Sequence, residues 1–173
     1  MAGTSSRGRP GPVSSDAPLG SGLGRGYHVT ANPCHYAQAA FTELAGATPV
    51  AVQIGSPAEE APRVLPDLKN ATPACAYRAI DAQAAVAADG SVLVSIAHRG
   101  TSGPIRLTVH VEDFPAKGPA EVRRLTADVP WAANTLEHPE RVKPADEPAE
   151  VNRGKLTLEL KPFTIVRVRV PRG

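Results

Sequence analysis

The chain has 173 residues, which corresponds to about one domain of ordinary size. It is too short for a (β/α)8 barrel, which needs roughly 200 residues or more. Nineteen Lys and Arg residues nearly balance 17 Asp and Glu residues, and the resulting net charge of +2 argues against a nucleic-acid-binding protein. One Trp, three Tyr and three Phe leave few side chains for base stacking or for a sugar-binding platform.

Residues 1–26 are dominated by Gly, Ser and Pro. Because this composition offers little apolar surface to bury, we expect a disordered tail. A phosphate-binding loop is not expected, since neither a strand nor a helix flanks Gly20, Gly22, Gly24 and Gly26. The N-terminus also lacks the apolar core of a secretory signal, and no apolar run approaches the ~18 residues that span a bilayer.

The two cysteines, Cys34 and Cys75, could form one disulfide or remain as two reduced thiols. We favour the reduced thiols, which give no indication of an oxidising compartment. Together with the missing secretory signal, they predict a cytoplasmic protein without membrane contact.

Residues 27–75 are expected to contain a helix, a strand and a Pro-rich loop. Apolar side chains recur at three- and four-residue spacing over 33–45, and Asn32 precedes this segment as a candidate N-cap. Gly46 is placed to end the helix in a left-handed conformation. The alternating, β-branched segment 48–54 predicts a strand, and the prolines of 55–75 predict a surface loop.

From about residue 76 onward, apolar residues alternate with polar ones, which is typical of half-buried strands. The turn signals Asp89-Gly90 and Gly154 separate successive strands and indicate antiparallel connections. On the last strand the pattern places Arg167 and Arg169 on the exposed face. Residues 76–173 therefore predict a mainly β domain, an antiparallel two-layer β-sandwich of jelly-roll-like character. The expected strands are 92–98, 105–112, 120–127, 155–160 and 163–170.

The five histidines offer no metal site. Only Cys34 and His35 are close in sequence, and neighbouring side chains on a helix point apart, so we predict no bound metal and no other cofactor. On the outward face of its strand, His110 is expected to be solvated. His98 ends a strand and is expected to cap a turn rather than to act as an acid or base.

No pair of carboxylates is placed for glycoside cleavage, which requires two of them on opposite sides of a cleft. Glu59 and Glu60 fall in the predicted Pro-rich loop, and Glu137 and Glu140 fall in another loop. Adjacent exposed glutamates are usually solvated. We therefore predict no catalytic residue in this chain.

The loop Asn134-Thr135-Leu136-Glu137-His138-Pro139-Glu140-Arg141-Val142-Lys143-Pro144 resembles a stretch of the C-terminal domain of α-L-arabinofuranosidases of glycoside hydrolase family 51. The segments Ala79 to Ala82, Val92 to Arg99, Val122 to Leu125 and Lys161 to Val166 resemble strands of that domain in the same order. Leu136 and His98 depart from the Phe and Asn of the family pattern. The resemblance covers roughly residues 76–170, and residues 31–53 resemble the last barrel helix and the strand that follows it.

The resemblance implies that the chain is a C-terminal β-sandwich fragment without the catalytic barrel. In the family, two glutamates of a (β/α)8 barrel cleave terminal α-L-arabinofuranosyl units with retention, and this chain has no Asn-Glu dipeptide to match the acid/base. The barrel would act as a partner in cis or in trans, and homo-oligomer contacts are possible. The chain would contact arabinose-containing polysaccharide only as part of the parent enzyme. A short N-terminal strand completes the sandwich in the family, and residues 1–26 contain no alternating run to supply it, so we expect an unpaired edge.

The alternative hypothesis is a free-standing carbohydrate-binding or subunit-interaction module. Trp131 is the one candidate for a sugar platform, and we expect it instead to fill space beneath the long loop next to Asn134. Whether the chain is a truncated product or a functional subunit is left open by the sequence.

Overall fold

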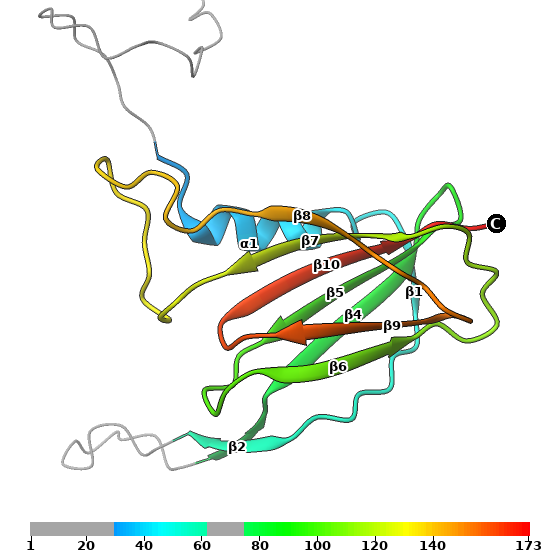
Figure 1. Cartoon of the computed structure of the whole chain (residues 1–173), viewed down its shortest axis with the longest axis horizontal. Helices are drawn as coiled ribbons and strands as arrows, with labels where there is room; N and C mark the ends of the chain where they lie inside the picture. Colours follow the sequence, from blue (N-terminus) through cyan, green and yellow to red (C-terminus); the bar gives the residue numbers. More distant parts are fainter. Residues whose placement is uncertain (1–29, 62–74) are drawn as a thin grey trace, which may run out of the picture.

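The computed structural model describes residues 30–61 and 75–173 (Figure 1). The predicted tail at 1–26 lies outside the described residues. The described elements are one helix and ten strands: α1 (Pro33–Thr42), β1 (Thr48–Val50), β2 (Ala58–Ala61), β3 (Cys75–Arg78), β4 (Ile80–Val86), β5 (Val92–His98), β6 (Ile105–His110), β7 (Ala120–Thr126), β8 (Ala145–Ala149), β9 (Lys155–Leu160) and β10 (Thr164–Val170).

Six strands form one antiparallel sheet in the order β1-β4-β5-β10-β7-β8. A two-stranded sheet, β6-β9, lies across one face of it, and β2-β3 form a further antiparallel pair (Figure 1). The predicted mainly β, two-layer antiparallel sandwich is thus confirmed, although its two layers are unequal in size.

The core lies between the six-stranded sheet and the β6-β9 pair. Alternation directs every second side chain of β5, β7 and β10 into this space, where it meets the leucines of β9. Three valines of β10 are fully inaccessible there, as is Leu160 of β9. The core consists of Ile80, Val92, Val94, Ile96, Ala120, Val122, Leu156, Leu158, Leu160, Val166, Val168 and Val170.

The opposite face of the six-stranded sheet is covered by α1, which packs on β7 and β10. Asn32 caps α1 as predicted, because its side chain accepts a 2.9 Å hydrogen bond from the backbone nitrogen of Cys34. The helix ends at Thr42, earlier than predicted, and Gly46 has the expected left-handed conformation with φ +79°. From the sheet, the Ser95 hydroxyl donates a hydrogen bond to the Ala40 carbonyl oxygen of α1.

Three expectations about the chain between residues 48 and 149 were wrong. The strand predicted for 48–54 is limited to β1, and the predicted loop at 55–75 contains β2, which pairs with β3. The long loop after β7 leads into the unpredicted strand β8. Both β2 and β8 are short and rich in polar residues, so that no apolar alternation marks them.

Candidate functional site

His98 is buried at the end of β5, and its imidazole holds the β9–β10 turn. Its Nδ1 lies 2.8 Å from the Lys161 carbonyl oxygen and 3.1 Å from that of Leu160. Because carbonyl oxygens only accept, Nδ1 carries the proton. The buried Nε2 has no hydrogen-bond partner among the described residues. His98 thus caps a turn as expected, but the turn is the one between β9 and β10 and not the one beside Arg99 and Gly100.

The other candidate metal ligands and bases are dispersed over the surface. His110 is exposed, as predicted, with Nδ1 3.7 Å from a carboxylate oxygen of Glu112. Cys34 and Cys75 are both free and exposed. Within residues 30–61 and 75–173, no three His, Cys, Asp or Glu side chains lie close enough together to hold a metal ion.

Glu59, predicted to be a solvated loop residue, is instead an anchor on β2. Its carboxylate accepts hydrogen bonds from the Thr101 nitrogen at 2.8 Å, the Thr101 hydroxyl at 3.1 Å, the Ser102 nitrogen at 3.3 Å and the Tyr77 hydroxyl at 3.0 Å. These donors, the Thr101 backbone first, lower the pKa of Glu59 to about 2. Such a carboxylate stays ionised and cannot act as a general acid near neutral pH.

The glutamates of the long loop make surface contacts. Glu140 forms an exposed ion pair with Lys143 at 2.7 Å, and a Glu137 oxygen lies 3.5 Å from the Thr135 hydroxyl. Glu137 and Glu140 lie away from Glu59 and Glu60, because their loop connects β7 to β8 at one edge of the six-stranded sheet, whereas β2 belongs to a separate pair of strands on the far side of the molecule (Figure 1).

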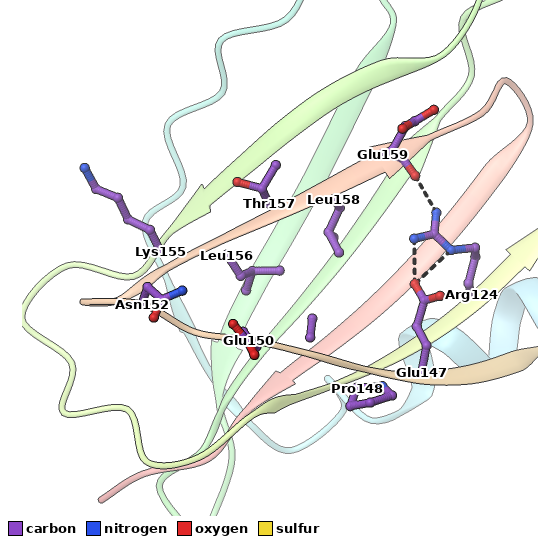
Figure 2. A pocket seen from close by; sticks show the side chains of 11 residues that line it. Arg124, Glu147, Pro148, Glu150, Asn152, Lys155, Leu156, Thr157, Leu158 and Glu159 are labelled. Carbon is purple, nitrogen blue, oxygen red and sulfur yellow. Dashed lines mark hydrogen bonds and ion pairs between the residues drawn. The ribbon is translucent and has the colours of Figure 1, made fainter.

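A wedge-shaped cleft of about 550 Å³ opens between β8 and β9, as Figure 2 shows. The two strands are joined through Arg153 and Gly154, whose φ angles of 51° and 73° form a tight turn, and they diverge because β8 joins β7 whereas β9 joins β6. Within the described residues, the edge of β9 facing this cleft pairs with another backbone segment only at Asn152, beside that turn. The predicted unpaired edge concerned a strand from residues 1–26, which lie outside the described residues, so it stays a prediction.

Arg124 bridges the open end of the cleft (Figure 2). Its guanidinium contacts one Glu147 carboxylate oxygen at 3.1 and 2.6 Å and donates a 2.8 Å hydrogen bond to the Glu159 carbonyl oxygen of β9. It thereby satisfies an edge acceptor of β9 that would otherwise point into the cleft. Arg124 therefore links β8 to β9 across the cleft.

A second cavity, of about 310 Å³, lies between α1 and the outer face of the sheet. Arg167, predicted to be exposed, is buried here, and its guanidinium forms an ion pair with Glu43 at the end of α1. Alternation placed Arg167 on the correct face, but α1 covers that face. Arg123 lines the same cavity and pairs with Asp146 at 2.7 Å.

The loop at residues 127–144 is braced from within. The Asn134 side chain donates to the Val142 carbonyl oxygen at 2.9 Å and accepts from the Val142 nitrogen at 2.8 Å, while Asp128 pairs with Arg141 at 2.8 Å. Trp131 is 79% exposed, so the expectation that it fills space beneath the loop was wrong. The apolar residue buried beside Asn134 is Val142 instead.

Sequence reasoning missed the residues that hold these surfaces together. Arg167 alternates with buried valines, so only its opposition to Glu43 distinguishes it from an ordinary outward arginine. Arg124 shares the core-facing side of β7 with Val122, and its opposition to Glu147 could not be predicted without β8. These oppositions depend on pairing with β8 and on the position of α1, and neither is visible as a local pattern.

The family profile described as "Alpha-L-arabinofuranosidase C-terminal domain" matches residues 23–164, which is more than half of the chain. No curated protein matches this chain. In the described part of the chain, no helix is long and apolar enough to cross a membrane.

Several solved structures share the fold. The family 51 arabinofuranosidase from Xanthomonas axonopodis pv. citri superimposes with a TM-score of 0.67 at 22% identity, covering 82% of this chain and 26% of its own. The α-L-arabinofuranosidase from Thermotoga petrophila RKU-1 gives 0.57 at 20% identity, covering 75% of this chain and 27% of its own. That from Thermotoga maritima, solved with arabinose, gives 0.53 at 21% identity over 69% of this chain and 24% of its own.

This chain therefore spans about a quarter of the enzymes that it resembles. The family profile covers α1, the braced loop and every strand from β1 to β9, and it ends at the first residue of β10. The chain belongs to the family of α-L-arabinofuranosidase C-terminal domains.

Proposed function

We propose that this chain is a structural C-terminal domain with no catalytic residue of its own, and that it stabilises the catalytic (β/α)8 barrel of an α-L-arabinofuranosidase supplied in cis or in trans. Hydrolysis of terminal α-L-arabinofuranosyl units, and contact with arabinose-containing polysaccharide, would then belong to the assembled enzyme. The cytoplasm is the proposed compartment, which the two free thiols support.

The match of residues 23–164 to the C-terminal domain of α-L-arabinofuranosidases carries this proposal, and the directions of the carboxyl pKa shifts support it. A glycosidase acid needs a raised pKa so that it is protonated when substrate binds. Among the described residues, every carboxyl group with a clear shift has a lowered pKa, and hydrogen-bond donors are the main cause each time. These groups are Glu59, Asp89, Asp128 and Asp146.

The larger cleft supports the same conclusion. Its best-placed carboxylate, Glu147, is held by the guanidinium of Arg124, and Glu150 and Glu159 are exposed at its rim. Retaining hydrolysis requires one protonated and one ionised carboxyl about 5 Å apart. The Glu147 carboxylate is instead engaged in its ion pair with Arg124.

The experiment is an assay of the purified full chain on 4-nitrophenyl α-L-arabinofuranoside. We expect no release of nitrophenol above that of a mock purification from cells carrying an empty vector. Hydrolysis above this background that is lost in Glu147→Gln, with Glu137→Gln as the exposed control, would contradict the proposal and place an active site in the cleft.

A further inference from the structure

We infer that the loop at residues 127–144 is the surface on which the preceding catalytic domain docks. This inference rests on the proposed function and adds to it the contact surface. The loop presents two large apolar side chains to solvent, Trp131 at 79% exposure and Leu136 at 66%. Tryptophan is the residue type most enriched among those that dominate the binding energy of protein interfaces.

The loop is fixed before any partner arrives. Asn134 binds both backbone groups of Val142, and the Asp128–Arg141 ion pair joins the two limbs that carry Trp131 and Leu136. Because the limbs are already ordered, little conformational entropy is lost on docking. A preformed apolar surface of this kind suits a folded protein partner.

The position of the loop identifies that partner. The Asn134 side chain also donates a 2.8 Å hydrogen bond to the carbonyl oxygen of Ala31, and the next residue, Asn32, caps α1. The loop therefore lies at the beginning of the folded domain, beside the start of α1 in Figure 1. In the enzymes that share this fold, about three-quarters of the chain lies outside the matched part. In an enzyme whose catalytic domain precedes this domain, the connection enters the fold at Ala31, and the loop lies beside that entry point.

Val50 and Val52 provide a matched control, because they are the other exposed large apolar side chains among the described residues. They lie on and just after β1, at the edge of the sheet opposite to β8. We would express the affinity-tagged full chain together with the Xanthomonas axonopodis arabinofuranosidase from which the matched C-terminal quarter has been removed. The readout is the amount of that barrel recovered with the chain. Melting followed by circular dichroism checks that each variant is folded.

We expect Trp131→Ser/Leu136→Ser to recover roughly tenfold less barrel than the wild type, as expected for the loss of dominant contacts. Val50→Ser/Val52→Ser should recover the wild-type amount, and Trp131→Phe should retain most of it. Equal recovery by both double variants overturns the docking surface and leaves the proposed function intact. If the wild type itself recovers no barrel, the proposed function fails as well.

Two other occupants of the loop are distinguishable in the same preparations. Trp131 is the chain's single tryptophan, so its fluorescence reports on this loop alone. A saturable fluorescence change on adding arabino-oligosaccharides would replace the inference with a sugar-binding site. A dimer in sedimentation that is lost only in Trp131→Ser/Leu136→Ser would replace it with self-association.

Discussion

The carboxylate of Glu59 accepts a 2.8 Å hydrogen bond from the backbone nitrogen of Thr101, and this contact ties β2 to the loop between β5 and β6. The Tyr77 hydroxyl on β3 donates to the same carboxylate, so one side chain links both β2 and β3 to this loop. The stacking of the Arg99 guanidinium over the Tyr77 ring at 5.7 Å adds a second contact at this point.

Replacing Glu59 with Gln should lower stability in a pH-dependent manner. The pKa of Glu59 is lowered from 4.5 to about 2, so its stabilising contribution is fully present above pH 4.5 and is lost as the pH falls toward 2. Melting temperatures measured between pH 2 and pH 7 should therefore show a wild-type advantage that disappears at the acidic end. Glu60→Gln, at an exposed neighbouring position, should leave the profile unchanged. A constant difference across this range would contradict the assigned role of the carboxylate.

Gly100→Ala should be destabilising because the space beside Glu59 is already filled. A Cβ at this position would lie 2.4 Å from a Glu59 carboxylate oxygen, 2.9 Å from the Ala79 Cβ and 3.0 Å from the His98 Nε2. We expect a loss of about 1–3 kcal/mol in the free energy of unfolding, measured by urea denaturation. Gly55→Ala is the matched control, because a Cβ there meets nothing within 4 Å. Equal effects at both sites would show that space beside Glu59 is not limiting.

Strands that are alternating or mainly apolar could be predicted from sequence, and those with neither pattern could not. The observed β5 and β9 match the predicted 92–98 and 155–160 because each strand has one face that packs into the core. By contrast, β2 and β8 consist mainly of small and acidic residues, and β8 even contains Pro148, which an edge strand tolerates. Pairing with β3 and β7 defines these two strands, and such long-range pairing leaves no local signal.

The same distinction holds for side chains at the candidate sites. The face occupied by Arg167 follows from alternation, but its burial depends on α1, more than a hundred residues earlier in the chain. For Trp131 the error lay in choosing a buried residue by size, whereas the loop buries Val142, whose backbone is bound on both sides by Asn134. The family motif identified this loop in the sequence. Which of its residues are exposed could be determined only from the fold.

The ion pair between α1 and the sheet should show a marked asymmetry between its two partners. Glu43→Ala leaves the buried Arg167 guanidinium, whose Nε already lacks a partner among the described residues, without its carboxylate. We expect this change to cost roughly 1–3 kcal/mol in the free energy of unfolding. Arg167→Met removes the buried charge and retains an unbranched side chain, so its effect should stay within about 1 kcal/mol. Urea denaturation of both variants tests the order, and a larger loss for Arg167→Met would contradict it.

Asn134→Ala should release the loop that carries Trp131. The change removes hydrogen bonds to the carbonyl oxygens of Ala31 and Val142, and it deprives the Val142 nitrogen of its acceptor. The free energy of unfolding should fall by about 1–3 kcal/mol, because the backbone groups of the buried residue Val142 lose their hydrogen-bond partners. Hydrogen exchange should show faster exchange of the Val142 amide, and the fluorescence anisotropy of the single tryptophan should fall. Gln53→Ala, which removes an exposed amide side chain, should change neither measurement. If the Val142 amide stays protected in Asn134→Ala, the loop is held mainly by the Asp128–Arg141 pair, and Arg141→Ala should then release it.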